Sequence, residues 1–309
     1  MSGQMAEILL PTYNGARYVR EQIDSILAQT DERWHLTLSD DGSNDGTQDI
    51  LDEYVRRYPE KIRRVVSGTR FGNARDHFYW LMRQCDAGYI MTCDQDDVWH
   101  DDKVHLTLEA LFSAEADHGA DEPILVFTDL APVDERLKQI SPSLMDMQQQ
   151  NPKATDYRNI LFQNIVTGGT MALNRPLKEL ALSCAETEQT IMHDWWMAVV
   201  AARFGHMVYV DRATMMYRQH GDNSVGARDV RSLSYLIHKL THLVEFQKTV
   251  VDKKKQAEIF TRTFSERLSE EEKKVLREFS APRSPFRLKW SYLKWINTPM
   301  RKLGFLARW

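Results

Sequence analysis

The sequence predicts an α/β protein with a mostly parallel central sheet. Short runs rich in Ile, Leu, Val, Thr and Tyr alternate with amphipathic helical segments, and strands that alternate with helices of this length form right-handed βαβ crossovers. Of the 309 residues, 42% are hydrophobic and 27% are charged, which is typical of a folded globular protein. This length allows one large α/β domain with an appendage.

Each predicted element has its own local pattern. Turn residues bound five β-rich runs, at 7–11, 35–40, 62–67, 89–94 and 124–129. Between the first four, apolar residues recur at helical spacing in segments that begin near Val19, Ile50 and Ala74. Later we expect a glycine-loosened strand at 167–173, a helix at 192–204 and a strand at 206–210.

The composition changes beyond Ser232. Residues 245–280 are charged and have a helical pattern, and Ser269 with Glu272 predicts a capping box for a last helix that ends near Phe279. We therefore expect one α/β domain over residues 1–230 and a helical C-terminal appendage over residues 231–309.

The end of the appendage is basic and aromatic. Residues 286–309 contain six Lys or Arg side chains, no acidic side chain and several Trp, Tyr and Phe. Such a segment suits an anionic membrane surface, so we expect peripheral membrane contact. The alternative is a terminal helix packed on the domain, with Lys and Arg stems covering apolar surface.

Charge and cysteine content narrow the function classes. The net charge of −4 gives no global positive field, so we expect no nucleic-acid partner. The three cysteines are an odd number without metal-ligand spacing, which favours reduced thiols in the cytoplasm. We find neither a signal segment nor an apolar run of about 18 residues. The expected location is the cytoplasm, including the cytoplasmic face of the inner membrane.

Acidic residues follow the second and fourth predicted strands, at 40–41 and 94–97. Ligands of open α/β sheets bind at the carboxyl ends of strands. Carboxylates on adjacent loops repel one another and raise a pKa unless a cation lies among them. Mg²⁺ and Mn²⁺ bind carboxylates together with substrate phosphates, so a divalent metal site is predicted here. The alternative is a solvated acidic loop before a helix that begins near Asp101.

Two turns complete the predicted ligand crevice. Residues 11–15 (PTYNG) follow the first strand, where Tyr13 can stack on a base. Residues 39–47 (SDDGSNDGT) follow the second strand, where the Asp41 carboxylate can accept the N3–H of uracil or thymine. The alternatives are an ordinary Asn-Gly turn and a helix-entry turn.

In this order the motifs resemble those of the GT-A glycosyltransferases of family 2, over about residues 7–226. The resemblance rests on PTYNG at 11–15, DDGS at 40–43, the Asp-x-Asp of Asp94 and Asp96, HDWW at 193–196 and YRQHG at 217–221. It implies a Rossmann-like nucleotide-diphospho-sugar transferase fold. It also implies metal-dependent transfer of a sugar to a hydroxyl, with inversion at C1 and Mg²⁺ or Mn²⁺ as the cofactor.

The resemblance further implies roles for the matching residues. Asp194 is the expected base, because a sugar hydroxyl is a poor nucleophile until a carboxylate takes its proton; the alternative is a carboxylate that caps its helix. The expected donor-nucleotide site comprises Pro11, Thr12, Tyr13, Asn14, Asp41, Arg75, Asp94 and Gln95. The expected metal ligands are Asp96, Asp94 and His220, and the expected acceptor or sugar pocket comprises Trp99, Gly169, His193 and Trp195.

Within the family, residues 93–99 (CDQDDVW) and 217–221 look most like bacterial rhamnosyltransferases and related polysaccharide-assembly enzymes. This likeness predicts dTDP-rhamnose as the donor and a glycan or lipid-linked acceptor. A UDP-glucose or UDP-galactose donor stays open, because hexose specificity depends on a few hydrogen bonds. Two other classes are a nucleotidyltransferase, whose Gly-rich basic phosphate loop is not matched by residues 14–17 (NGAR), and a non-catalytic sugar-nucleotide-binding module.

Overall fold

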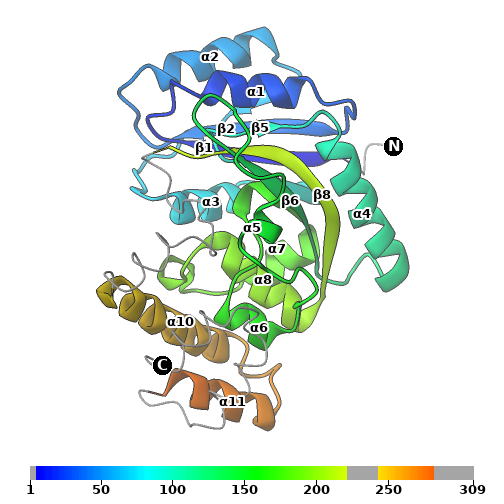
Figure 1. The fold of residues 1–309 in the computed structure, drawn as a ribbon, viewed down its shortest axis with the longest axis vertical. Coiled ribbons are helices and arrows are strands. Elements are labelled where there is room, and N and C mark those ends of the chain that lie inside the picture. The colour runs from blue at the N-terminus through cyan, green and yellow to red at the C-terminus, as the bar shows by residue number, and fades with distance from the viewer. Residues whose placement is uncertain (1–4, 221–242, 282–309) are drawn as a thin grey trace.

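The computed structural model describes residues 5–220 and 243–281. Within them, helices cover both faces of a central sheet (Figure 1). The strands are β1 (Ala6–Thr12), β2 (Trp34–Asp40), β3 (Ile62–Arg64), β4 (Tyr89–Thr92), β5 (Val98–Trp99), β6 (Ile124–Val133), β7 (Met171–Asn174) and β8 (His206–Arg218). The helices are α1 (Val19–Leu27), α2 (Thr47–Arg57), α3 (Ala74–Arg83), α4 (Lys103–His118), α5 (Leu144–Met147), α6 (Tyr157–Phe162), α7 (Arg175–Leu182), α8 (His193–Phe204), α10 (Leu243–Thr263) and α11 (Glu270–Ser280).

The strands form one mixed sheet in the order β3-β2-β1-β4-β7-β6-β8-β5. Strands β1 to β4 pair in parallel, as do β6 and β8, whereas β7 and β5 are antiparallel to their neighbours. The predicted α/β class with a mostly parallel sheet is confirmed, because four of the seven strand pairings are parallel. The carboxyl ends of β1, β2 and β4 therefore meet at one edge.

Two apolar cores lie on opposite faces of the sheet. Helices α1, α2 and α4 cover one face, and helices α3, α6, α7 and α8 cover the other. Successive residues of β1 alternate between the cores: Ile8 and Leu10 belong to the first, and Leu9 to the second. All seven residues of β1 are buried, as expected for a strand covered on both faces.

Several elements differ from their predicted bounds. Strand β8 extends to Arg218 instead of residue 210, because it pairs with β6 along most of its length. Strand β5 was not predicted, and it forms by pairing Val98 and Trp99 with β8. Residues 168–170 are a short 3₁₀ helix, η1, and not the start of a strand, because the amide and the hydroxyl of Thr170 both donate to the carbonyl of Thr167.

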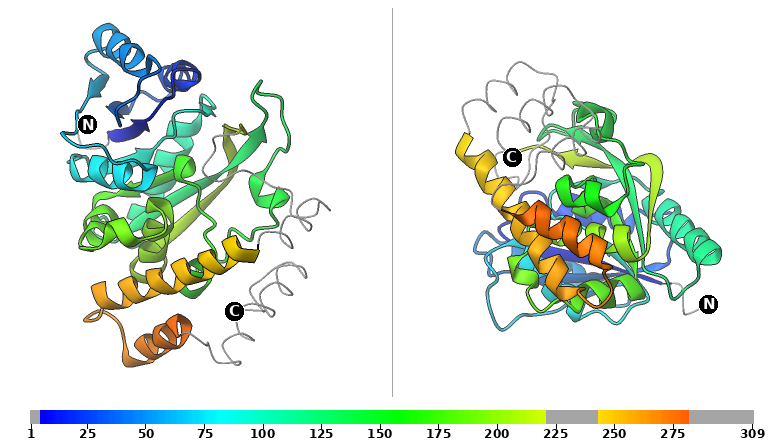
Figure 2. Two further views of the ribbon diagram at one scale, coloured as in Figure 1. Left: turned by 90° about the vertical axis from the view of Figure 1, so that its left-hand side faces the viewer. Right: turned by 90° about the horizontal axis from the view of Figure 1, so that it is seen from below.

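The described part of the appendage packs on the α/β domain. Phe260 of α10, Phe264 directly after α10 and Phe279 of α11 belong to the same core as Trp196 of α8, and α10 and α11 lie together at the end of the molecule remote from α1 and α2 (Figure 2). The capping box of Ser269 and Glu272 is present at the start of α11.

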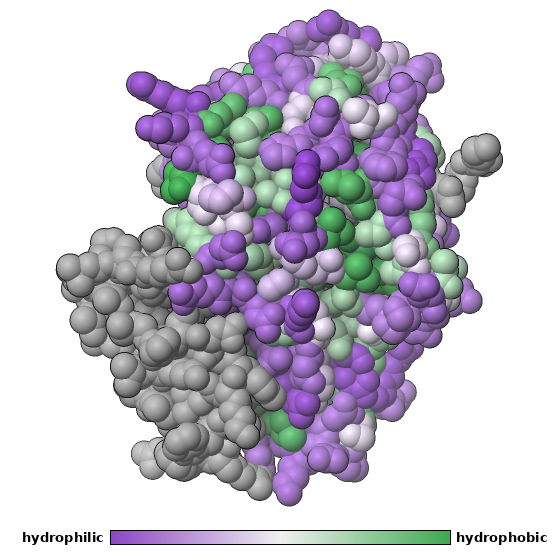
Figure 3. All heavy atoms as spheres, turned by 45° about the vertical axis from the view of Figure 1, so that its right-hand side comes forward, coloured by the Kyte–Doolittle hydropathy of each residue, from purple (hydrophilic) through white to green (hydrophobic). Residues whose placement is uncertain are grey.

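Membrane contact was expected of residues 286–309, which lie outside the described residues. Within the described ranges, no helix combines the length and apolar character needed to span a bilayer. Hydrophilic side chains cover most of the face shown in Figure 3, with apolar side chains interspersed.

Candidate active site

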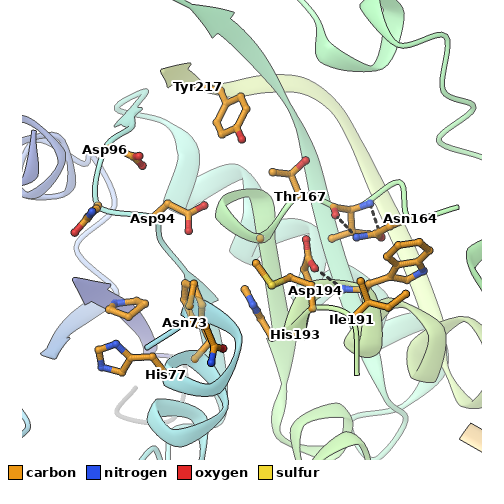
Figure 4. Close-up of a pocket in the computed structure, with 18 of the residues that line it drawn as sticks. Asn73, His77, Asp94, Asp96, Asn164, Thr167, Ile191, His193, Asp194 and Tyr217 are labelled. Carbon is orange, nitrogen blue, oxygen red and sulfur yellow. Dashed lines mark hydrogen bonds between the residues drawn. The ribbon is translucent and has the colours of Figure 1, made fainter. Parts of the chain in front are cut away.

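A cavity of about 480 Å³ lies at the carboxyl ends of β1, β2 and β4. Asp94 and Asp96 lie on one side of it and Asp194 with Asn164 on the other, with His193 between them (Figure 4). The predicted residues that line the cavity are Pro11, Tyr13, Asp41, Asp94, Gln95, Asp96, His193, Asp194 and Trp195. The predicted residues that do not line it are Thr12, Asn14, Arg75, Trp99, Gly169 and His220.

The loop after β2 places Asp41 on the wall of the cavity. Its side chain is 5% exposed, and its two carboxylate oxygens accept hydrogen bonds from the backbone amides of Phe71 (2.6 Å) and Gly72 (2.7 Å). Each carboxylate oxygen still has a lone pair for a ligand. Gly72 has φ of 72°, which a glycine adopts without strain. The carboxylate is thus fixed in direction before any ligand binds.

The loops after β1 and β4 are joined by one amide side chain. Gln95 accepts a hydrogen bond from the Tyr13 amide (2.9 Å) and donates one to the Tyr13 carbonyl (3.0 Å). A Cβ at Gly15 would come within 2.3 Å of Gln95 Oε1, so only glycine fits there. The Tyr13 ring is 45% exposed, with the Arg70 guanidinium 4.7 Å from its centroid. An exposed aromatic face at this end can stack on a base.

Thr12 and Asn14 support these loops without reaching the cavity. The Thr12 hydroxyl donates to Asp40 Oδ2 (2.9 Å). The Asn14 side chain accepts from the amide of Asn44 (3.1 Å), and the Asn14 amide donates to Ser43 (2.7 Å). Both residues belong to the scaffold between the first two loops, in contrast to the expected nucleotide contact.

The acidic loop after β4 crowds three carboxylates together. Burial, followed by the charges of Asp96 and Asp194, raises the pKa of Asp94 to about 7. Burial and the charges of Asp96 and Asp94 raise the pKa of Asp97 well above its usual range. His220 Nε2 lies 2.7 Å from Asp96 Oδ2, which brings the end of the YRQHG motif to this loop.

Arg218 was not predicted as a site residue, yet it fixes the acidic loop. It is 2% exposed; its amide donates to Asp97 Oδ1 (3.0 Å) and its Nε to the Asp96 carbonyl (2.9 Å). The guanidinium lies 4.6 Å from the Tyr18 ring centroid, and Tyr18 stacks on His220. Arg218 thus orients both Asp96 and His220. Its position in the YRQHG motif at 217–221 could have identified Arg218 as a site residue.

Trp99 lies in the core and not in the expected sugar pocket. It is 3% exposed, and its ring centroid is 4.8 Å from Lys103 Nζ. The pairing of β5 with β8 turns it away from the cavity. Lys103 is 1% exposed, and burial lowers its pKa to about 8. No local sequence signal distinguishes Lys103 from a surface lysine.

The acidic loop suits a cation whose remaining ligands come from a substrate. Among the described residues, no three His, Cys, Asp or Glu side chains are grouped so that they could hold a metal ion by themselves. Mg²⁺ and Mn²⁺ commonly take one or two carboxylates and complete their shell with phosphate oxygens and water. The adjoining Asp96 and His220 fit that partial set. Burial, followed by the charges of Asp96 and Asp194, raises the pKa of Asp94, and a cation would relieve the repulsion between these charges.

Asp194 stands at the start of α8, on the other side of the cavity. Burial raises its pKa to about 7, against the opposing effect of hydrogen bonds from the Trp195 and Gly168 amides. The Trp195 amide donates to Asp194 Oδ1 (2.6 Å), but Asp194 lies inside the first turn and is not the N-cap residue of α8, which is Met192. A carboxyl group that titrates near neutrality and lines a cavity is a candidate general base.

Long-range contacts hold the segment that precedes Asp194. Arg75 donates to the Thr190 carbonyl (2.7 Å), and the Tyr79 hydroxyl lies 2.9 Å from Thr190 Oγ1. The Ile191 amide donates to Oε1 of Gln256 in α10 (2.9 Å). Arg75 therefore supports the segment before Asp194, and its expected contact with the nucleotide stays a prediction. Gln256, which is fully buried, was not predicted at all.

The remaining predicted residues either line the cavity or lie behind a residue that lines it. Trp195 lines the cavity and donates from its indole to the Ile160 carbonyl, whereas Trp196 is fully buried in the core. Gly169 lies behind Asp94: a Cβ there would come within 3.2 Å of Asp94 Oδ2. A larger residue at 169 would push the Asp94 carboxylate out of place.

A sheet of this topology, with acidic loops at its carboxyl edge and a carboxylate across the cavity, matches the GT-A fold expected from the sequence. The chain belongs to glycosyl transferase family 2, whose family model matches residues 7–175. It is 31% identical over 227 residues to dTDP-rhamnosyl transferase RfbG of Shigella flexneri, a match that covers 71% of this chain and 74% of that protein.

Solved structures share the fold at low sequence identity. S. aureus TarS 1–349 in complex with UDP superposes with a TM-score of 0.55 at 15% identity, covering 98% of this chain and 86% of that one. GalNAc-T7 with UDP, GalNAc and Mn²⁺ superposes with a TM-score of 0.56 at 14% identity, covering 96% of this chain and 58% of that one. These likenesses establish the GT-A fold.

Proposed function

We propose that this chain is an inverting, metal-dependent glycosyltransferase that moves rhamnose from dTDP-rhamnose to a hydroxyl of a glycan or lipid-linked acceptor in bacterial surface polysaccharide synthesis. The observation that carries the proposal is the placement of Asp194 across one cavity from Asp94 and Asp96. This arrangement supports Asp194 as the proposed base and the loop of Asp94 and Asp96 as the proposed diphosphate-binding loop. The likeness to a dTDP-rhamnosyl transferase supports the choice of sugar.

The donor nucleotide would bind at the end of the cavity lined by Asp41 and Tyr13. The Asp41 carboxylate would accept the N3–H of thymine, and Tyr13 would stack on the ring. Because the backbone amides of Phe71 and Gly72 already fix Asp41, little side-chain entropy is lost on binding. The same contacts would accept uracil, so UDP-glucose and UDP-galactose remain the alternative donors.

Asp96 and His220 would hold Mg²⁺ or Mn²⁺, with Asp94 beside them. The cation supplies charge stabilisation to the departing diphosphate. Arg218 keeps the backbone of Asp96 in place through the bond to its carbonyl, so the loop need not reorganise when the diphosphate binds.

Asp194 would take the proton of the acceptor hydroxyl as the oxygen attacks C1. The new C1–O bond forms on the face opposite the diphosphate, and the electron pair of the old C1–O bond leaves with the diphosphate. This displacement inverts the configuration at C1. A carboxylate whose pKa is near 7 is a stronger base than an ordinary aspartate and is still largely ionised above pH 7.

A donor screen tests this proposal. The protein is incubated with dTDP-rhamnose, UDP-glucose or UDP-galactose, with Mn²⁺, Mg²⁺ or EDTA, and release of nucleoside diphosphate is measured. We expect metal-dependent release that is fastest from dTDP-rhamnose. Faster release from a UDP-hexose would change the proposed donor sugar but not the proposed class of enzyme. Exchange of a nucleoside triphosphate with a sugar 1-phosphate would favour a nucleotidyltransferase, and binding without turnover would favour a non-catalytic module.

We further propose that the basic aromatic segment 286–309 contacts an anionic membrane at the cytoplasmic face, near lipid-linked acceptors. Liposome flotation of the whole chain and of a chain ending at Ser280 tests this proposal. We expect the whole chain alone to float with anionic vesicles, and equal flotation of the two chains would contradict it.

A further inference from the structure

The segment between β6 and β7 brings two glutamines to the cavity. Gln148 and Gln150 line it, although neither belongs to a motif on which the family resemblance rests. Both side chains are partly exposed, and the Gln150 amide nitrogen donates to Gln148 Oε1 (3.0 Å). In the part of the chain that the structure describes, this is the only side-chain hydrogen bond of either residue. Each amide therefore keeps a polar atom for a ligand.

The backbone of this segment is fixed at both ends of α5. At its start, the carboxylate of Asp129, which is 6% exposed, accepts hydrogen bonds from two backbone amides of α5 (3.2 Å each). At its end, the Gln149 amide donates to the Asp146 carbonyl (3.1 Å). The Gln150 amide donates to the Met145 carbonyl (2.8 Å). These two bonds form a Schellman motif with Gln149 in the left-handed region at φ of 50°, so the glutamines on either side of it are held in place.

The order of the strands places the glutamine pair beyond the proposed diphosphate loop. Along the sheet, the loops after β2 and β1 carry Asp41 and Tyr13, and the loop after β4 carries Asp94. Strand β7 is antiparallel to both β4 and β6, so β4 and β6 end at the same edge. A nucleotide sugar with its base at Asp41 and its diphosphate near Asp94 would leave the part of the cavity after β6 to the acceptor.

The charge of the cavity wall restricts which acceptor can bind there. The wall carries the carboxylates of Asp41, Asp94, Asp96 and Asp194, and none of the described residues that line it is Lys or Arg. An anionic acceptor group would therefore meet like charges without a counter-ion, which is unfavourable in a partly desolvated site. The amides of Gln148 and Gln150 are neutral, and amides both donate to hydroxyls and accept from them.

We propose that Gln148 and Gln150 bind hydroxyls of the acceptor, and that the acceptor residue that enters the cavity is an uncharged sugar. Uronic acids and phosphorylated sugars are excluded by the charge of the wall. The inference rests on the proposed function, and it adds the chemical class of the acceptor and two residues that recognise it. Asp194 remains the proposed base, and the glutamines act in binding alone.

Matched glycosides test the selection by charge. The whole chain is incubated with Mn²⁺ and the donor selected by the screen, and glycosyl transfer is measured by product mass. Methyl glucoside and methyl galactoside are compared with the corresponding methyl uronides, which differ by a carboxylate. We expect kcat/KM to be at least about tenfold higher for the neutral member of a pair. Equal or faster transfer to the uronides would overturn the inference.

Two leucine variants test the glutamines themselves. Gln148→Leu and Gln150→Leu keep similar side-chain volume and remove the hydrogen-bonding atoms. Each should raise the KM for the neutral glycoside roughly 3- to 10-fold, the effect of losing one neutral hydrogen bond, with the KM for the nucleotide sugar unchanged. An unchanged KM for the glycoside in both variants would overturn the inference. A change confined to the KM for the nucleotide sugar would also overturn it, because the pair would then bind the donor.

Gln149→Gly is the matched control. The Gln149 side chain does not line the cavity, and glycine adopts a φ of 50° without strain. The variant should keep the KM for the glycoside and should not melt below the wild type.

Gln150→Arg tests the charge argument in the opposite direction. A guanidinium on the wall would pair with the carboxylate of a uronide, so the ratio of kcat/KM for the glucuronide to kcat/KM for the glucoside should rise by about tenfold or more. The ratio is informative even if the variant is less active, because a loss of folded protein lowers both rates equally. An unchanged ratio would contradict the inference.

Failure of the proposed function is distinguishable from failure of this inference. If the wild type turns over none of the nucleotide sugars, the proposed function fails, and binding of the same glycosides is measured by ligand-observed NMR with dTDP and Mn²⁺ present. The neutral glycosides should still bind more tightly than the uronides, and Gln148→Leu should weaken their binding. A wild type that neither binds nor glycosylates any neutral glycoside would overturn the inference.

Discussion

The two sides of the cavity are built in different ways. On the proposed nucleotide side, Asp41 and Tyr13 lie directly after strands, and neighbouring loops hold one another, as Gln95 holds Tyr13. On the proposed catalytic side, the segment before Asp194 is held by Arg75 of α3 and Gln256 of α10. The first side is thus held by the loops that follow the strands, and the second side is held by side chains of two helices. Substitutions on one side should leave the other side working.

Asp194→Asn should have the largest effect on turnover. The amide has nearly the same shape but cannot accept the proton of the hydroxyl, so kcat should fall roughly 10²- to 10⁴-fold. Affinity for the nucleoside diphosphate, measured by calorimetry with Mn²⁺, should stay within about twofold, because Asp194 lies across the cavity from the acidic loop.

Glu188→Gln provides the matched control, since it removes a carboxylate from an exposed position close to Asp194 in sequence. It should leave kcat unchanged. Undiminished turnover by Asp194→Asn would exclude Asp194 as the base.

Asp96→Asn should affect the nucleotide side instead. Loss of the carboxylate removes the charge that lies beside His220 and weakens the proposed cation site, so metal-dependent affinity for the nucleoside diphosphate should fall roughly tenfold to 100-fold. Titration of nucleotide binding with and without Mn²⁺ measures this effect. Asp101→Asn, in the exposed turn that follows, is the control. Equal affinity for Asp96→Asn and wild type in Mn²⁺ would contradict the metal assignment.

The two sides of the cavity also differ in how far they could be predicted from the sequence. Strands β1, β2, β4 and β6 are rich in Ile, Leu, Val, Thr or Tyr, and parallel pairing of β1, β2 and β4 then places Asp41 and Asp94 at one edge. The class of fold follows from such local signals, and so does the part of the cavity lining that follows these strands, namely Pro11, Tyr13, Asp41, Asp94, Gln95 and Asp96. The order of the motifs along the chain also made the loops after these strands recognisable as part of a site.

Contacts distant in sequence could not be predicted. Trp99 was expected in the sugar pocket, but its burial depends on β5 pairing with a strand more than 100 residues later. Arg75 was expected at the nucleotide, but its partner is the carbonyl of Thr190. Gln256 lies in a charged helix that reads as an appendage. In each case the position of the side chain depends on a contact partner that is distant in sequence, and local sequence patterns do not reveal that partner.

Gln256→Met tests whether α10 is part of the catalytic side. The substitution preserves side-chain volume and removes the acceptor of the Ile191 amide, which costs about 1 kcal/mol and loosens the segment before Asp194. We expect kcat to fall roughly threefold to tenfold, with KM for the donor nearly unchanged. Lys255→Gln, on the exposed face of α10, is the control. A change in donor KM alone would mean that α10 acts on the nucleotide side.

The pH dependence of stability gives the smallest effect. Burial raises the pKa of Asp194 from 3.8 to about 7, so between these values the native state binds more protons than the unfolded state, and stability falls as pH rises. Asp194→Asn should therefore melt a few degrees higher than wild type at pH 8 and at the same temperature near pH 3. The hydrogen bond from Arg33 lowers the pKa of Asp31 to about 2, so Asp31→Asn should show the opposite sign and melt lower at pH 8. Parallel behaviour of the two variants in calorimetry would show that burial of Asp194 does not set its pKa.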